Sequence, residues 1–311
     1  MNKDFKIHFL NTIWSDALIL ESNGHFAMID SASEFYYPMI QDYLKNLGIN
    51  ELDFVLLTHF HSDHYGNLAK LFNDYKIGKL YIKKYTNHEG STGDSREFTL
   101  DYLAKELETY QTIIDAATKS SEVCYLEDDG SNYLTIPFEN VTLELYDVVN
   151  HIDKLYNDEN SEFYHQNRFN ENFNSIAIFV KHNGKNIYLG ADVTNSDTSI
   201  PELHKLSERI VKRIYKEHHI RHIDVYKSCH HGGSGTNQIE LTNLLKAKYC
   251  VITNTDRWLD NWNTISNLKE SNPNVEILKS DHYQYVFDFS KSKINLEKVP
   301  CESLFITLNK D

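Results

Sequence analysis

The residues best suited to chemistry lie together in one short segment. The stretch "LLTHFHSDHYGN" directly follows an apolar run and contains, within six positions, His59, His61, Asp63 and His64. Zinc and similar cations bind imidazole nitrogens and carboxylate oxygens at about 2.0–2.2 Å, so several such side chains must converge on one small volume. The spacing lets His59 and His61 face one ion. Asp63 and His64 lie further along the turn and can face a second ion, so the sequence predicts two neighbouring metal sites.

Two later segments supply candidate partners for this cluster. Asp192 ends the apolar run "NIYLGAD", and a carboxylate is a usual bridge between two ions because each oxygen can bind one of them. "HIDVYKSCHHGGSG" places His230 and His231 at another strand end, before glycines that let the backbone bend sharply. Either feature alone is commonly structural. In this order behind the first segment, both indicate ligands, although the spacing leaves open which of the two histidines binds metal.

The surrounding sequence predicts alternating strands and helices that place these segments at strand ends. "DALILESNGHFAMIDSA" is typical of two strands around an Asn-Gly turn, residues 33–48 of a helix ended by glycine, and "ELDFVLLT" of a strand. The metal-binding segment would then follow the C-terminal end of a strand, where open α/β sheets bind their ligands. Further strands are predicted in "VTLELYDVV" and "NSIAIFVKHNGKNIYLGAD", and a helix from about Ile200 to Tyr215.

Composition and charge limit the class of protein. With 41% hydrophobic and 24% charged residues, the chain can bury a core, and we predict a single domain over residues 1–311 with a helical insertion or cap at about 84–135. It has no apolar stretch of about 20 residues and no signal-peptide pattern, which predicts a cytoplasmic protein without membrane contact. The formal net charge of −14 repels polyanions, so extended nucleic acid would need a locally basic surface.

These motifs carry a family resemblance. The HxHxDH segment, the strand-terminal "LGAD" and "KSCHHGGSG" resemble the metallo-β-lactamase superfamily of metal-dependent hydrolases. Within it the sequence is most similar to the metallohydrolase domain of ComEC-type DNA-uptake proteins and to phosphorylcholine esterases, and "WSDALILESNGHFAMIDSA" is similar to the start of that group. The resemblance covers most of residues 8–255. It implies an α/β fold, an αββα sandwich, to which the inserted segment would add a helical cap.

The resemblance also implies a role for particular residues. Asp192 would bridge the two ions, and family order favours His230 over His231 as ligand of the second ion. Asp30 would lie behind the metal loop and orient a ligand histidine, and Asn174 matches an Asn-Ser pair of the ComEC-like group. Many members supply a third histidine to the first ion from the segment before the bridging aspartate. No clear equivalent is present, and the candidates in that segment, for which we favour a solvent-exposed position, are His151 and His165.

The mechanism implied is hydrolysis assisted by two divalent metal ions, Zn²⁺ foremost, with Mn²⁺ or Fe as alternatives. Two such ions lower the pKa of a bridging water from 15.7 toward about 7 and provide hydroxide at neutral pH. Asp63 could accept a hydrogen bond from this nucleophile. His231 or Lys227 could protonate the leaving group or hold an anionic substrate, although Lys227 can equally be a plain strand residue.

Substrate information is sparse in the sequence. A basic stretch, residues 205–221, includes Arg209 and Arg213; most such stretches are solvated helix faces, but one that borders the pocket would attract phosphates. Ser234 could add a hydrogen-bond donor. We therefore expect a phosphodiesterase acting on a small or short phosphodiester, which includes nucleotides. The alternatives are a DNA or RNA nuclease of the ComEC-like type, which the net charge disfavours, and a non-catalytic metal-binding partner subunit, which the full set of second-ion ligands disfavours.

Overall fold

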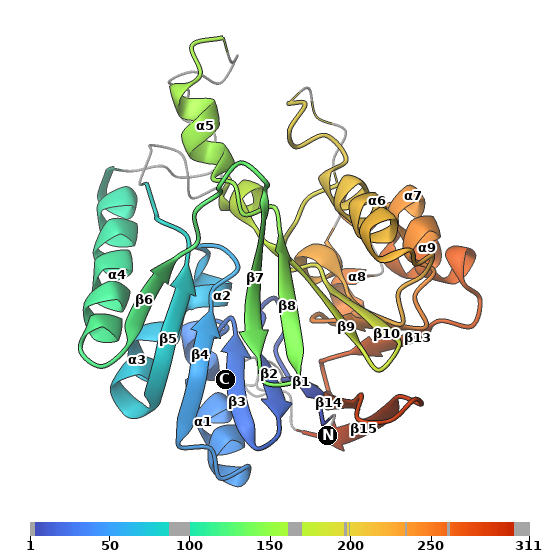
Figure 1. Ribbon diagram of the computed structural model, residues 1–311, viewed down its shortest axis with the longest axis horizontal. Coiled ribbons are helices and arrows are strands. Elements are labelled where there is room, and N and C mark those ends of the chain that lie inside the picture. The colour runs from blue at the N-terminus through green and yellow to red at the C-terminus, as the bar shows by residue number, and fades with distance from the viewer. Residues whose placement is uncertain are drawn as a thin grey trace.

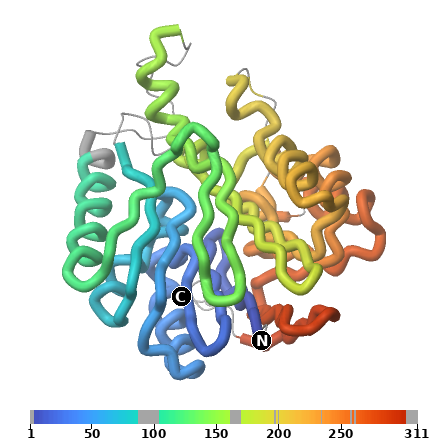
Figure 2. Tube along the Cα trace, viewed as in Figure 1, coloured from blue at the N-terminus to red at the C-terminus, as the bar shows by residue number. Residues whose placement is uncertain are grey.

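The structure, a computed structural model, contains two β-sheets packed face to face. It describes residues 4–86, 100–160, 170–195, 198, 200–233, 235–259 and 262–301. The first sheet has the strand order β15-β14-β1-β2-β3-β4-β5-β6. Its strands are β1 (Lys6–Phe9), β2 (Leu18–Ser22), β3 (His25–Ile29), β4 (Glu51–Leu56), β5 (Lys76–Ile82), β6 (Glu122–Tyr125), β14 (Tyr283–Asp288) and β15 (Asn295–Pro300). Because β1 pairs with β14, an early and a late segment of the described chain share this sheet, and Figure 2 shows them side by side in blue and red.

The second sheet has the order β13-β12-β11-β10-β9-β8-β7. Its strands are β7 (Tyr133–Phe138), β8 (Val141–Tyr146), β9 (Ala177–His182), β10 (Lys185–Leu189), β11 (Val225–Lys227), β12 (Tyr249–Ile252) and β13 (Glu276–Lys279). Strands β3 to β6 are parallel in the first sheet and β10 to β13 in the second. The C-terminal ends of parallel strands share one edge of a sheet, so each sheet offers one edge on which loops can assemble a site.

Helices cover the outer face of each sheet (Figure 1). In chain order the helical elements of the described residues are η1 (Glu34–Tyr36), α1 (Tyr37–Asn46), α2 (Ser62–Tyr65), α3 (Leu68–Asp74), α4 (Leu100–Thr118), α5 (His151–Asn157), η2 (Glu171–Asn174), α6 (Leu206–His218), η3 (Cys229–Gly232), α7 (Ile239–Leu245), α8 (Asp256–Leu259) and α9 (Thr264–Ser271). Of these, α5 rises beyond the upper end of the strands in Figure 1. One apolar cluster lies between the sheets, a second joins α1, α3 and α4 to the first sheet, and a third joins α6, α7 and α9 to the second. The predicted αββα sandwich is therefore confirmed. None of the described helices is both long and apolar enough to cross a membrane.

The segment 84–135 is built into this sandwich. We expected its helix to form a cap, but α4 packs against α3 and buries Ile113 and Ala117 in the cluster on the first sheet. The following strand β6 pairs with β5 in parallel, so α4 is the crossover helix between two neighbouring strands. Residues 87–99 of the segment lie outside the described part of the chain.

Local backbone conformation fixes the turn of one predicted hairpin and the first residue of one predicted helix. The predicted hairpin forms from β2 and β3, and its turn residues Asn23 and Gly24 have positive φ angles of 53° and 81°. The helix expected from Ile200 begins only at Leu206, because the preceding residue Lys205 has a left-handed φ of 46° that a helix cannot contain.

Candidate metal centre

Four side chains from three separate segments form one group of potential metal ligands. Asp63 and His64 lie on α2, directly after β4; Asp192 follows β10, and His231 follows β11. His231 Nε2 lies 3.1 Å from Asp63 Oδ2 and 3.5 Å from Asp192 Oδ1, and His64 Nε2 lies 3.4 Å from Asp192 Oδ1 and 3.7 Å from Asp63 Oδ2. Donors on one tetrahedral ion with bonds of 2.0–2.2 Å are about 3.3–3.6 Å apart. The group therefore has the dimensions of a single cation site.

Two orphaned atoms in this group fit a bound cation. His64 Nε2 and Asp192 Oδ1 are both buried, and neither has a hydrogen-bond partner within the described residues. Buried polar atoms are nearly always partnered, because leaving them unsatisfied costs the full desolvation penalty. Both atoms belong to the same group, so one divalent ion would satisfy them together.

A second group adjoins the first through Asp192. Its members are His59, His61 and Asp192. His59 Nε2 lies 3.0 Å from His61 Nδ1 and 3.7 Å from Asp192 Oδ2. One carboxylate oxygen of Asp192 thus faces each group, which is the arrangement of a ligand shared by two ions. We call the group with His59 and His61 the first site, and the group with Asp63, His64 and His231 the second site.

The histidine pair is divided differently from our expectation. The structure places His231, not His230, in the second site, with its side chain 1% exposed. A ring buried among potential ligands is poorly placed to protonate a leaving group, so the position of His231 favours a place among the second-site ligands over the catalytic role that we expected. The reason is the backbone: both residues have positive φ angles, 47° and 50°, and this tight turn sends the two rings in different directions. His230 lies at the opening, with 35% of its side chain exposed.

Two comparisons with known proteins bear on this arrangement. Residues 15–137, which include the HxHxDH segment, match the model of the Metallo-beta-lactamase superfamily. The metallo-β-lactamase fold protein YhfI from Bacillus subtilis is similar over 92% of this chain and 99% of its own, with a TM-score of 0.53 and 11% identity. The chain has the metallo-β-lactamase fold.

A further solved structure, a diphosphatase from the PhnP family, is similar over 92% of this chain and 98% of its own. Its TM-score is 0.50 and its identity 12%, so the likeness is one of fold. No curated protein matches the chain. The finer resemblance to ComEC-type domains and phosphorylcholine esterases stays a prediction.

The charged and buried groups around the two sites favour the binding of a positive charge there. Burial lowers the pKa of His59 well below its ordinary value, which keeps the ring neutral and able to bind a cation. Burial also acts to lower the pKa of His231, but the charges of Asp192 and Asp16 outweigh it and raise that pKa to about 9. The carboxylates thus attract positive charge to the second site, whether as protons or as a metal ion.

Asp30 lies behind the second site and orients His64. The ring N–H at His64 Nδ1 donates to Asp30 Oδ2 at 2.8 Å, which turns Nε2 toward the site. The backbone N–H and the hydroxyl of Thr58 each donate to Asp30 at 2.8 Å and fix the carboxylate in turn. Such partners of metal-binding imidazoles set the ring orientation and raise its basicity.

Replacement of Asp30 by alanine should weaken the second site. Without its acceptor, His64 loses the contact that orients its ring, and we expect the second-site metal affinity to fall by roughly 10–100-fold while the first site changes little. Titration of the chelator-treated protein with Zn²⁺, followed by calorimetry, measures both affinities. Equal affinities in Asp30→Ala and the wild type would show that the contact has no role in metal binding.

Asp16 lies behind His231 as Asp30 lies behind His64, and the sequence did not predict this role. Asp16 Oδ1 lies 3.2 Å from His231 Nδ1. The hydroxyl of Thr253 links the two, because its oxygen lies 2.9 Å from His231 Nδ1 and it donates to Asp16 Oδ1 at 2.8 Å. The other oxygen of Asp16 pairs with the Nζ of Lys227. The only signal was the similarity of "WSDALIL" to the start of the family, which carried no role for Asp16.

Lys227 is part of this buried network and not of the substrate opening. Its side chain is 1% exposed. Burial acts to lower its pKa, but the charge of Asp16 outweighs burial and raises the pKa above its ordinary value. Lys227 is therefore a charged strand residue that holds Asp16 in place, which corrects the expectation that it contacts substrate.

Two other predicted residues lie outside the ligand groups. The Asn174 side-chain oxygen accepts the backbone N–H of His151 at 2.9 Å, and its amide nitrogen lies 3.3 Å from Glu171 Oε2. His151 is buried and binds Asp147 at 2.9 Å, so it is neither solvent-exposed, as we expected, nor directed at the metal groups. His165 and Ser234 lie outside the described residues.

The two arginines of α6 make contacts within the chain. Arg209 donates to the carbonyl oxygens of Pro201 and Glu202 at 2.9 and 2.8 Å. Arg213 binds Glu217 at 2.8 Å and lies over the rings of two tyrosines on β7 and β8. These arginines tie α6 to its neighbours, which differs from the substrate-binding role we expected.

Proposed function

We propose that this protein is a metal-dependent hydrolase that cleaves a small phosphodiester with two divalent ions, Zn²⁺ foremost. The observation that carries the proposal is the position of Asp192, whose two oxygens face two adjacent groups of ligands. A pair of ions about 3.5–4 Å apart recurs in phosphatases and nucleases, where it stabilises the attacking and leaving oxygens of an in-line displacement. The similarity to a diphosphatase of the PhnP family supports a phosphorus centre as the target.

The residues around the site would have separate roles in metal binding and in positioning the attacking water. Bound divalent ions would supply Lewis acidity and a water of lowered pKa. Asp63 is 29% exposed, whereas His64, Asp192 and His231 are 0–1% exposed, so Asp63 is the second-site member that can accept a hydrogen bond from the attacking water. Asp30 and Asp16 hold the rings of His64 and His231 in fixed tautomers from behind.

Charge supports a small substrate over a polymer. The chain carries a net charge of −14, and the arginines of α6 are held by their own neighbours. A long nucleic acid needs many cationic contacts along its track, and the log of its affinity then falls with log salt with a slope of about −0.7 to −0.9 per contact. A small phosphodiester needs only one or two.

Salt dependence should therefore be shallow. We expect turnover of a short phosphodiester to change by less than about threefold between low and physiological salt, because few ion pairs form with the substrate. Steady-state kinetics at graded KCl concentrations measure this. Degradation of long DNA that is much faster than cleavage of any dinucleotide, and that collapses with salt, would replace our proposal with the nuclease.

Removal of metal tests the proposed activity itself. Purified protein is assayed against bis-p-nitrophenyl phosphate, a linear dinucleotide and single-stranded DNA, before and after treatment with a chelator. We expect cleavage of the first two to disappear with the metal and to return on addition of Zn²⁺ or Mn²⁺. Cleavage that survives complete metal removal would contradict the proposal.

A further inference from the structure

His230 lies beside the first site in a conformation that the chain adopts at a cost. His230 and His231 are consecutive residues with positive φ angles of 47° and 50°. A left-handed conformation is strained for a residue other than glycine, and such strain gathers at functional sites. Burial of His231 in the second site gives a reason for one of the two conformations. The other calls for a reason of its own.

Distances indicate that reason. His230 Nε2 lies 3.7 Å from Asp192 Oδ2, the oxygen that His59 Nε2 also approaches at 3.7 Å. Two donors on one tetrahedral ion are about 3.3–3.6 Å apart, so each ring lies slightly farther from this oxygen than ligands that share an ion. His230 lies outside the compact group that His59, His61 and Asp192 form, so its ring would have to move closer to join them. The two histidines of the pair thus divide between the two oxygens of Asp192.

The side chain of Asn172 is a buried polar neighbour of His230. Its Nδ2 donates a hydrogen bond of 3.4 Å to His230 Nε2, the nitrogen that would bind a cation. Asn172 is 3% exposed, and its Oδ1 has no hydrogen-bond partner within the described part of the chain. A cation on Nε2 would take the place of this hydrogen bond, and rotation of the amide would then turn the unsatisfied Oδ1 toward the cation.

We propose that His230 is the third imidazole ligand of the first site, in the place of a histidine from the segment before Asp192. The inference rests on the proposed function in that it presumes a metal ion at the first site. A site with three imidazoles and the shared carboxylate would have the four donors that a tetrahedral cation takes.

Metal content and spectroscopy test this assignment. The wild type, His230→Ala and His61→Ala are reconstituted with Co²⁺ and compared by elemental analysis and visible absorption, with the exposed His222→Ala as a matched control. We expect two ions per chain in the wild type and in His222→Ala. Both His230→Ala and His61→Ala should hold one firmly, with a first-site affinity reduced by more than the roughly 10–100-fold that loss of an outer contact costs.

The possible failures are distinguishable. If the wild type takes up no metal, the proposed function fails and this inference fails with it. If His230→Ala keeps two ions with unchanged affinity and an unchanged cobalt spectrum, only the assignment of His230 is overturned. His230→Gln, together with circular dichroism, separates loss of a ligand from loss of the fold.

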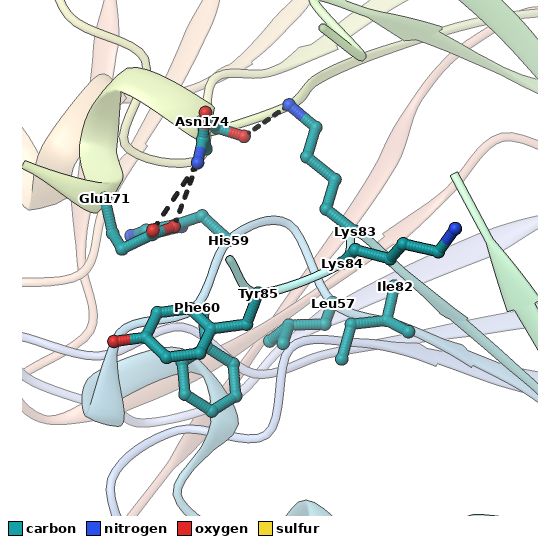
Figure 3. Close-up of a pocket in the computed structure, with 9 residues that line it drawn as sticks. All are labelled: Leu57, His59, Phe60, Ile82, Lys83, Lys84, Tyr85, Glu171 and Asn174. Carbon is teal, nitrogen blue, oxygen red and sulfur yellow. Dashed lines mark hydrogen bonds between the residues drawn. The ribbon is translucent and has the colours of Figure 1, made fainter. Parts of the chain in front are cut away.

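A second inference concerns the turn η2, which carries Asn172. Its first residue, Glu171, is 4% exposed, accepts a hydrogen bond of 3.3 Å from the amide of Asn174, and lines the same small cavity as Phe60. Phe60 lies between the ligands His59 and His61 in the chain. Figure 3 shows Glu171 with His59 and Asn174 around a small cavity of about 10 Å³. We infer that Glu171 is a positioning residue that fixes the backbone between the two first-site histidines.

The contact should be recoverable with a neutral acceptor. We expect Glu171→Ala to lower first-site metal affinity by roughly 10–100-fold, and Glu171→Gln, which keeps the size of the side chain and one acceptor oxygen in the cavity, to restore it to within a few-fold of the wild type. Glu208, also 4% exposed but on α6, provides a matched control. If Glu171→Ala and Glu208→Ala lower the melting temperature alike and leave first-site affinity unchanged, the role of Glu171 is merely structural.

Discussion

Replacement of Asp192 by alanine empties both metal sites at once. Its Oδ1 faces the second site and its Oδ2 the first, so neither ion keeps a full set of ligands when the carboxylate is lost. We expect metal content to fall from about two ions to fewer than one per chain. Turnover should fall on the order of 10³-fold or more, which corresponds to at least about 4 kcal/mol of activation free energy.

Asp224 provides the control for this experiment. It is also largely buried, at 8% exposure, and its carboxylate accepts the backbone N–H of Asn186 at 2.9 Å. Asp224→Ala should lose stability but keep its metal content. An Asp192→Ala protein that retains one tightly bound ion would show that the two sites do not depend on the shared carboxylate.

Lys227→Met should destabilise the protein strongly. Lys227 and Asp16 are each 1% exposed and pair with one another, so removal of the lysine leaves a buried carboxylate without its cation. Breaking a buried ion pair from one side costs about 3–5 kcal/mol in the free energy of unfolding. Denaturant titration of the chelator-treated protein measures the loss without a contribution from bound metal.

A double variant separates charge from packing. Asp16→Asn together with Lys227→Met leaves no unpaired charge in the interior and should recover most of the lost stability. Second-site metal affinity should nevertheless stay below that of the wild type, because the ring of His231 keeps its contact with the Thr253 hydroxyl but loses the negative charge of Asp16 beside it. A Lys227→Met protein within about 1 kcal/mol of the wild type would mean that the pair is not needed for the fold.

The parts of the site that sequence predicts are those encoded locally. His59 to His64 follow a strand directly, and Asp192 ends another, so periodicity and residue type suffice to place them at sheet edges. The two-sheet sandwich follows from a family resemblance carried by the same motifs. Hairpin turns such as Asn23-Gly24 are predictable because their φ angles demand particular residues.

The remaining features depend on contacts that local patterns do not encode. Asp16 and Lys227 are 211 positions apart, and neither has a neighbour in sequence that indicates the other. The division of work between His230 and His231 is set by two left-handed residues in succession, which residue type alone does not predict.

The contacts of Arg213 with tyrosine rings and those of the helix α4 were also not predictable from local sequence patterns alone. Arg213 has the spacing of a basic binding face. Its partner Glu217 follows four positions later on the same helix and is predictable from that spacing, but the tyrosine rings beneath Arg213 are brought close only by the fold. The helix α4 has an amphipathic pattern that fits a cap as well as a crossover helix, and the pairing of β6 with β5 decides between them.

Anomalous scattering from crystals of the metal-loaded protein tests the central claim most directly. Data collected on both sides of the zinc or manganese absorption edge locate bound ions independently of any assumed ligand. We expect two peaks about 3.5–4 Å apart, one on each side of the Asp192 carboxylate, with His231 beside the second and His59 beside the first. No peak at Asp192, or a single peak that leaves His59 and His61 without an ion, would contradict the account.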